Sequence, residues 1–223
     1  ASAIAAFYER AGVVTTLAGR TGSVTVIGAV SPPGGDMAEP VTAHTQRFVR
    51  CLWTLDRELA YARHYPAVSW AESFSRDTEA LDAHHAATDD PERPARRARV
   101  ARLLAEADRL TELVDLLGIT ALPARERVSV LGGRLVREGV LQQSALSDRD
   151  AYSGPEKTAA LAEAVAAVVD RCHELAAAGV PAPHIEEVDF SPVLRAREEA
   201  GPHDAATVET LCATMLARLK EVS

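Results

Sequence analysis

The stretch SPPGGD at residues 31–36 has the glycines that a phosphate-binding loop needs between a strand and a helix. A P-loop also requires a lysine for the β- and γ-phosphates and a serine or threonine for magnesium. The dipeptide Gly-Lys occurs nowhere in the chain, and Asp36 would repel a phosphate group. The residues alone therefore favour a turn, whose members are Ser31, Pro32, Pro33, Gly34, Gly35 and Asp36.

Other reactive side chains form no recognisable catalytic or metal-binding pattern. The cysteines, which lack the spacing of zinc ligands, are Cys51, Cys172 and Cys212. His84 and His85 are adjacent, so on a helix they point to different faces and would not share a metal. Glu186 and Glu187 are more typical of a solvated helix start than of an acid/base pair. We therefore predict no catalytic residue and no metal site.

Two tyrosines lie in segments rich in turn residues, where a flat ring could bind. Tyr65 precedes Pro66, and the proline favours an extended backbone for the residue before it. Tyr152 lies near the end of LQQSALSDRDAYS, residues 141–153, between two predicted helices. Ordinary packing explains both tyrosines. The alternative is an apolar slot between the two halves of the chain, in which an aromatic ligand stacks.

The first third of the chain has the pattern of an α/β layer. β-branched runs at 13–19 and 23–30 flank a GRTG turn, and the apolar run 51–55 predicts a third, buried strand. Short helices are predicted from Pro40 and after Asp56, a suitable N-cap residue. The alternation of strands with helices favours a partly parallel sheet.

The remainder predicts a helical bundle, because apolar residues recur every three or four positions. The four predicted helices lie at 93–118, 123–141, 155–179 and 203–222. A charged segment between Asp82 and Pro94 is predicted to be an exposed connection. The sequence therefore predicts an α/β domain at 1–78 followed by an all-α domain at 79–223.

Composition argues against several functional classes. The chain has 223 residues, 47% of them hydrophobic, and a net charge of −8. A nucleic-acid-binding protein needs a clustered excess of lysine and arginine, which this acidic chain lacks. No apolar run approaches the length of a membrane span, so we predict no direct membrane insertion.

Three blocks of the sequence resemble a known family. GSVTVIGAVSPPGGDMAEPVT, FVRCLWTLDRELAYARHYPAVSW and VLQQSA…DAYS are similar to the C-terminal part of the catalytic A subunit of V-type and archaeal-type rotary ATPases. The resemblance runs from about Ile4 to about Tyr152 and continues loosely through the helical tail. It implies the C-terminal portion of a P-loop-type nucleotide-binding sheet, followed by a C-terminal helical bundle. The proline–glycine loop is then the family's signature turn.

The resemblance also implies roles for individual residues. Tyr65 and Pro66 resemble the aromatic–proline pair that packs against the adenine ring, and Tyr152 resembles the aromatic residue on the opposite wall. Leu146 stands where the family usually has phenylalanine, and a leucine side chain has no π-face to stack on a base. Arg76 stands where related non-catalytic subunits carry an arginine. It is either an extra charge near a neighbour's nucleotide or a surface residue.

For the intact protein, the resemblance implies ATP or ADP with Mg²⁺, and coupling of ATP hydrolysis or synthesis to proton or sodium translocation. The implied partners are the B subunits of the hexameric head and the central rotor stalk, at the cytoplasmic face and peripheral to the membrane. We expect this chain to be a fragment without the P-loop, the Walker B aspartate and the catalytic glutamate, inactive alone and without tightly bound nucleotide. The alternative is a truncated, non-catalytic paralogue that acts as a helical interaction module, which Leu146 and Arg76 favour.

Overall fold

The computed structural model describes residues 2–87 and 90–222. The chain divides into two compact units. The first consists of Ala1–Thr54 and Glu72–Glu79, and the second of Leu55–Ala71 and Ala80–Ser223. The division into domains 1–78 and 79–223 stays a prediction.

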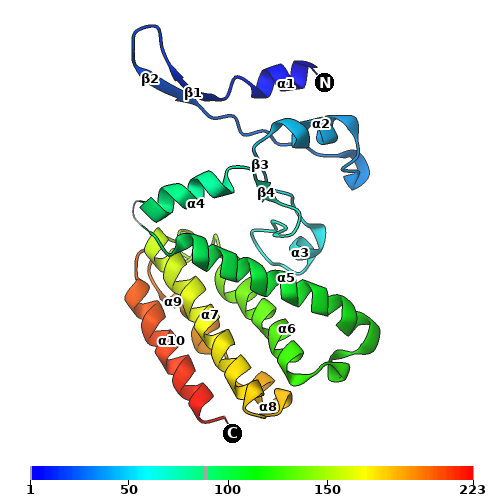
Figure 1. Cartoon of the computed structure of the whole chain (residues 1–223), viewed down its shortest axis with the longest axis vertical. Helices are drawn as coiled ribbons and strands as arrows, with labels where there is room; N and C mark the ends of the chain where they lie inside the picture. Colours follow the sequence, from blue (N-terminus) through cyan, green and yellow to red (C-terminus); the bar gives the residue numbers. More distant parts are fainter. Residues whose placement is uncertain (1, 88–89, 223) are drawn as a thin grey trace. The chain divides into compact units, whose positions relative to one another are not determined.

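The first unit contains short helices and two small sheets (Figure 1). Its elements are α1 (Ser2–Tyr8), β1 (Gly12–Thr15), β2 (Thr21–Val24), the 3-10 turn η1 (Pro33–Gly35), α2 (Pro40–Phe48), β3 (Cys51–Leu52) and β4 (Phe74–Ser75). β1 pairs with β2 and β3 pairs with β4, both in antiparallel register. The predicted partly parallel pairing is therefore not found among the described strands. A link as short as the GRTG turn reverses the chain, and parallel strands need a long crossover.

The strands are also shorter and more exposed than the sequence predicted. The run 23–30 is strand only as far as Val24. The run 51–55 forms a two-residue strand, and Trp53 is 75% exposed, so the prediction of a buried strand is wrong there. Each strand has a single partner in its sheet. A sheet of two strands has little apolar surface of its own with which to bury β-branched side chains.

Both short helices predicted in the first third of the sequence are confirmed. α2 begins at Pro40, and the side chain of Glu39 accepts hydrogen bonds from the N–H groups of Val41 and Thr42. The side chain of Asp56 caps the following helix in the same way. These carboxylates pair N–H groups that have no partner inside the helix.

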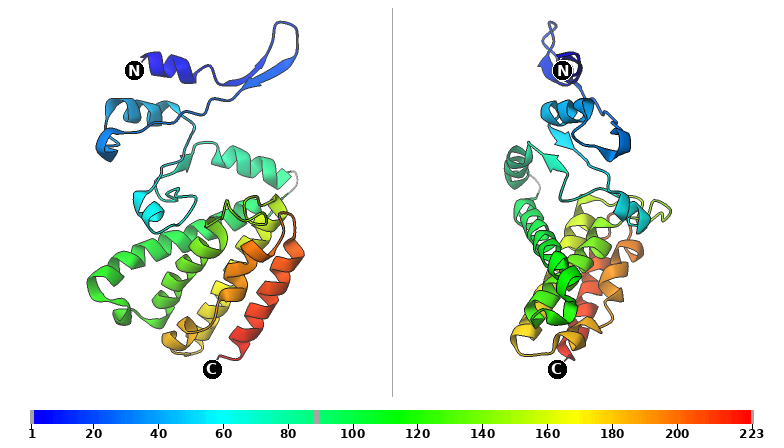
Figure 2. Two further views of the ribbon diagram at one scale, coloured as in Figure 1. Left: turned by 180° about the vertical axis from the view of Figure 1, so that it is seen from behind. Right: turned by 90° about the vertical axis from the view of Figure 1, so that its right-hand side faces the viewer.

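The second unit is a bundle of helices (Figure 2). Its elements are α3 (Arg57–Tyr61), α5 (Arg93–Leu117), the 3-10 turn η2 (Ile119–Ala121), α6 (Ala124–Val136), the π-helical turn η3 (Arg137–Leu141), α7 (Pro155–Ala177), α8 (Ala182–Glu186), α9 (Ser191–Glu199) and α10 (Ala205–Lys220). α5 packs on α6, α6 on α7, and α7 on α10. The predicted helical bundle is confirmed. Gly118 ends α5 with a φ of 81°, and Pro155 begins α7.

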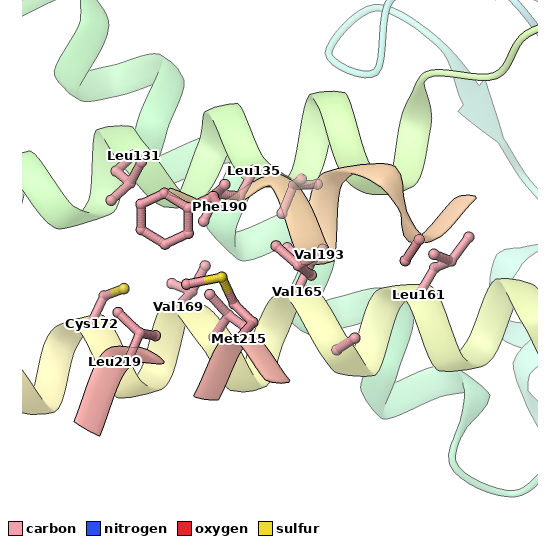
Figure 3. Packing of buried hydrophobic residues seen from close by; sticks show 14 of the residues in the cluster. Leu131, Leu135, Leu161, Val165, Val169, Cys172, Phe190, Val193, Met215 and Leu219 are labelled. Carbon is pink, nitrogen blue, oxygen red and sulfur yellow. The ribbon is translucent and has the colours of Figure 1, made fainter. Parts of the chain in front are cut away.

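One apolar core joins α6, α7, α9 and α10 (Figure 3). Leu135 of α6, Val165 of α7 and Met215 of α10 are fully buried in it, and Phe190 at the start of α9 is 3% exposed. Burial of such side chains is the main favourable term that holds the helices together.

Helices α5 and α6 approach closely at Gly133. A Cβ built on Gly133 would stand 2.1 Å from the Cβ of Ala107, a separation that real atoms do not reach. Glycine lowers helix propensity, but here it lets the two backbones come together.

The segment 82–94, predicted to be an exposed connection, is partly helical. α4 (Thr78–Ala87) covers its first residues and α5 begins at Arg93, so helix replaces the predicted connection there, although most of the described residues are exposed as predicted. Residues 88 and 89 of the predicted connection lie outside the described residues. A hydrogen-bonded ion pair of 2.6 Å joins Asp82 of α4 to Arg97 of α5. The ion pair thus ties this segment to the bundle.

The segment Leu55–Ala71 is anchored to the bundle through Trp70. The indole Nε1 of Trp70 donates a hydrogen bond of 2.8 Å to Asp108 of α5. The guanidinium group of Arg137 lies 5.9 Å from the Trp70 ring, within the range of a cation–π contact. These contacts explain why the segment belongs to the same compact unit as the helices.

Candidate functional site

Tyr65 and Pro66 follow α3 in the second unit, and the peptide bond between them is cis. The Tyr65 hydroxyl donates a hydrogen bond of 3.4 Å to the carbonyl of Ala60, and the residue is 53% exposed. The preceding His64 is buried and contacts the edge of the Trp70 ring. Burial, helped by the nearby charges of Arg137 and Arg197, lowers the pKa of His64. The tyrosine ring is therefore held at its hydroxyl while much of its surface stays accessible.

The residues 142–154, which we call the slot loop, connect η3 to α7 and carry the other predicted site residues. The main-chain N–H of Gln143 donates a hydrogen bond of 2.7 Å to the carbonyl of Tyr65. Leu146 is 98% exposed and Tyr152 is 58% exposed. The fold thus joins the slot loop directly to the tyrosine–proline pair, and it leaves these side chains free of the core.

A buried ion pair fixes the inside of the slot loop. The carboxylate of Asp150 is nearly inaccessible, accepts the Ser144 N–H at 2.6 Å and pairs with the guanidinium of Arg197. Arg197 also donates from Nε to the carbonyl of Glu138 at 3.1 Å. Removing either partner of such a pair leaves an uncompensated buried charge. The pair therefore ties the loop to α9, and Arg197 also ties α9 to η3.

A cavity of about 200 Å³ opens beside this ion pair. Its lining combines apolar and polar side chains, namely Val140, Leu141, Gln142, Gln143, Asp150, Ser153, Thr158, Leu161 and Arg197. Small-molecule sites commonly have this mixture of apolar walls and a few polar groups that fix orientation. The cavity lies along both ends of the slot loop.

Lys157, in the first turn of α7, is a residue of this region that sequence reasoning missed. It is fully buried, and its Nζ donates to the carbonyls of Arg149, Arg197 and Ala200 at 2.6, 2.7 and 3.1 Å. Burial lowers the pKa of Lys157, and the nearby carboxylate of Asp150 opposes that shift. The sequence does contain a signal, since Lys157 is one of only two lysines in the chain.

Two family models match the chain. Residues 1–75 match the nucleotide-binding domain of the ATP synthase alpha/beta family, and residues 83–183 match the C-terminal domain of V and A type ATP synthase. The chain belongs to the V- and A-type ATP synthase family. The resemblance seen in the sequence is thereby confirmed.

Three curated relatives in this family are 40% identical or more over most of this chain. The V-type ATP synthase alpha chain of Nitrosococcus oceani is 47% identical over 212 residues, which cover 95% of this chain and 35% of the relative. The A subunit of the A-type ATP synthase of Haloferax volcanii is 40% identical over 222 residues, which cover 100% and 38%. That of Pyrococcus abyssi is 44% identical over 203 residues, which cover 90% and 19%. The chain therefore spans between 19% and 38% of the length of these ATP synthase proteins.

The remaining predicted residues of the ATP synthase resemblance lie in the first unit. The proline–glycine loop forms the exposed turn η1, in which Gly34 and Gly35 have φ values of 66° and 79°. The guanidinium of the exposed Arg76 donates to the carbonyls of Arg47 and Gln46, both at 3.2 Å. It therefore caps the C-terminal end of α2. The functional roles of the loop and of Arg76 stay predictions.

Two further properties of this ATP synthase family member bear on metal binding and membrane crossing. The described residues contain no group of three or more histidine, cysteine, aspartate or glutamate side chains that could hold a metal ion. In the same part of the chain, no helix is both long and apolar enough to span a bilayer.

Proposed function

We propose that this chain is the C-terminal part of the catalytic A subunit of a V- or A-type ATP synthase. The whole protein would couple ATP hydrolysis or synthesis to the translocation of protons or sodium ions. In this proposal, Tyr65 and Pro66 form one wall of the adenine pocket and Tyr152 forms the opposite wall. Leu146 contributes an aliphatic contact where the family usually has an aromatic ring.

The hydrogen bond between Gln143 and Tyr65 is the observation that carries the proposal. It draws the loop with Tyr152 toward the tyrosine–proline pair, although the two segments are far apart in the sequence. Both tyrosines are more than half exposed, so their rings are available to a ligand. Adenine is flat and largely apolar on its faces, and stacking on aromatic side chains is the usual way to bind such a ring.

The described residues fit the adenine end of a nucleotide but not the phosphate and magnesium end. The chain has no Gly-Lys pair, and the described carboxylates form no cluster that could hold a metal ion. We therefore assign no step of phosphate chemistry to this chain. In the proposal, the much longer chains of the relatives supply those groups, with the P-loop-type sheet to which the first unit would contribute.

The helical bundle would contact the central rotor stalk, and B subunits would complete the hexameric head. The assembled head would lie peripheral to the membrane at its cytoplasmic face. The match of residues 83–183 to the C-terminal domain of V and A type ATP synthase supports this assignment. A bundle that swings about a hinge beside a nucleotide site is a known way to pass a binding event to a partner.

A chimaeric protein tests the proposal. This chain would replace the matching C-terminal part of the Haloferax volcanii relative, and the complex would be purified and assayed for Mg²⁺-dependent ATP hydrolysis. We expect the chimaera to assemble and to hydrolyse ATP, and the 223-residue chain alone to show no hydrolysis. A chimaera that folds but fails to assemble, or a steady ATPase rate from the chain alone, would contradict the proposal.

A second candidate is a non-catalytic paralogue that serves as a helical interaction module. Leu146 favours it, because an exposed leucine cannot offer the π-face that a base stacks on. The Leu146→Phe variant of the chimaera distinguishes the two. If this chain belongs to a catalytic protein, the variant should bind nucleotide at least as tightly as the parent chimaera. If it is an interaction module, both chimaeras should bind nucleotide no more tightly than a Haloferax volcanii protein that lacks the replaced C-terminal part.

A further inference from the structure

The end of α9 and its link to α10 contact the slot loop at two backbone positions. We call residues 197–203 the brace segment. The N–H of Gly154 donates to the carbonyl of Pro202 at 2.7 Å. The guanidinium of Arg149 donates to the carbonyl of Glu199 at 2.9 Å. The second half of the slot loop is thus held at both ends by main-chain groups of the brace segment.

The brace segment also contacts the side chain of Tyr152. The rings of Tyr152 and His203 meet edge to face, with 5.8 Å between centroids and an interplanar angle of 61°. This is the geometry that aromatic pairs prefer. The Nδ1 atom of His203 lies 3.3 Å from a carboxylate oxygen of Glu156, which holds the imidazole in place. His203 therefore limits the orientations that the Tyr152 ring can adopt.

Lys157 joins the slot loop and the brace segment through a single ammonium group. One of its three N–H donors binds the carbonyl of Arg149, in the slot loop. The other two bind the carbonyls of Arg197 and Ala200, in the brace segment. Every donor of the buried ammonium is therefore used, and each goes to a main-chain oxygen.

The stability of α7 does not explain a lysine at this position. Lys157 lies in the first turn of α7, where the helix dipole disfavours a positive charge. Two of its partners lie at the C-terminal end of α9, where carbonyls lack partners within the helix and attract a cation. The ammonium group of Lys157 thus stabilises the junction between α9 and the slot loop rather than α7.

We propose that Lys157 is a positioning residue of the nucleotide site, because it fixes the loop that carries Tyr152 to the brace segment. The inference rests on the proposed function for its ligand, since Lys157 acts through Tyr152 and not on the base. A ligand that stacks on Tyr152 would then be sensed at residues 197–203, in the last helices of the bundle. The competing possibility is that Lys157 only holds the bundle together.

Amide hydrogen exchange on the full chain, without nucleotide, separates these possibilities. The Lys157→Met variant keeps the length and packing of the side chain and removes its three donors. We expect the amides of Ser144, Ala151 and Gly154 to exchange about tenfold faster, as local loss of hydrogen bonds implies. The control is Met215→Ala, which opens the core between α7 and α10 without touching the loop. Equal acceleration in both variants, spread evenly over the bundle, would overturn the proposal.

An ADP titration on the same proteins adds the functional readout. At matched global stability, Lys157→Met should weaken ADP binding severalfold, and Met215→Ala should leave it at the wild-type value. Equal affinities of the two variants would overturn the positioning role. If the wild-type chain binds no ADP, the proposed nucleotide site fails, and the exchange measurement still decides whether Lys157 fixes the loop.

His203 provides a second test should Lys157→Met not fold. His203 is exposed, so its substitution leaves the core intact. His203→Ala removes the ring contact, whereas His203→Phe retains it. We expect the Tyr152 ring resonances to shift further in the alanine variant than in the phenylalanine variant, and the Gly154 amide to exchange faster in the alanine variant only. Identical spectra for wild type and His203→Ala would show that the brace segment does not hold Tyr152 through His203.

Discussion

The carbonyl of Tyr65 accepts a hydrogen bond of 2.7 Å from the main-chain N–H of Gln143. This bond joins the segment after α3 to the loop after η3, in which Leu146 and Tyr152 stand exposed. The side-chain hydroxyl of Tyr65 has its own partner, the carbonyl of Ala60. The geometry therefore fixes the backbone of the tyrosine–proline pair and leaves the ring accessible.

Replacing Gln143 by proline tests this bond directly. Proline lacks the N–H donor, and the preceding Gln142 already has the extended backbone that a following proline requires, with ψ of 138°. We expect Gln143→Pro to lower the free energy of unfolding by about 1 kcal/mol and to increase the mobility of Tyr65. Gln143→Ala keeps the donor and is the matched control. Equal unfolding curves for the two variants would show that the bond contributes nothing.

Gly133→Ala tests the close contact between α5 and α6. The new methyl group would overlap Ala107, so we expect a loss of about 1–3 kcal/mol in the free energy of unfolding. Gly132→Ala is the control on the same helix, because its Cβ would meet only the Val169 side chain, at 3.0 Å. Urea unfolding followed by circular dichroism measures both. A Gly133→Ala variant as stable as wild type would contradict the close approach.

The three cysteines should differ strongly in reactivity. Cys51 is exposed, whereas Cys172 is buried and burial raises its pKa to about 12. Burial also raises the pKa of Cys212. Because the thiolate is the reactive form, Ellman's reagent at pH 8 should modify Cys51 quickly, the partly buried Cys212 more slowly, and Cys172 only as the bundle opens. Cys51→Ser should abolish the fast phase, and a fast phase that persists in this variant would refute the assignment.

The buried His64 should make the free energy of unfolding fall as the solution becomes more acidic. Its folded-state pKa lies below the ordinary value because burial and the charge of Arg137 disfavour the imidazolium. The unfolded chain therefore binds the proton more tightly than the folded chain. The contribution of His64 to the free energy of unfolding is complete above about pH 6.5 and is lost as the pH falls toward the folded-state pKa. Urea unfolding between pH 8 and pH 5 measures how the free energy of unfolding changes with pH.

The control for this effect uses His173, a partly buried histidine. Burial also lowers the pKa of His173, so it contributes to the same slope. We expect His64→Gln to flatten part of the pH dependence and the double variant with His173→Gln to flatten more. A profile for His64→Gln that superimposes on the wild-type profile would rule out His64 as a source.

The helical half of the fold could be predicted because its signals are local. Apolar periodicity and the residues at the helix ends, such as Gly118 and Pro155, need no knowledge of the rest of the chain. The helix α4 was missed because the charges around Asp82 suggested a solvated connection. Those charges instead make ion pairs with α5, which the sequence does not reveal.

The strands and the buried polar groups could not be predicted to the same extent. The length of a strand depends on its partner, and β2 and β3 each have a single short one. The tyrosines of the candidate site were found through their turn-rich surroundings, together with the family resemblance. Lys157 was missed because a lysine in a first helical turn usually points to solvent. Only the fold brings three carbonyls from two other segments to its ammonium group.

The most direct test of the adenine slot is an NMR titration of the full chain with ADP, observed at the ring resonances of Tyr65 and Tyr152. We predict that both rings shift along one saturation curve. Tyr65→Ala and Tyr152→Ala should each weaken binding by about 5- to 150-fold, because base–aromatic stacking contributes ~1–3 kcal/mol. Tyr61→Ala, which removes another exposed tyrosine, is the control and should bind as wild type does. If the two ring resonances do not shift with ADP, or if the alanine variants bind ADP as tightly as wild type, Tyr65 and Tyr152 do not form an adenine slot.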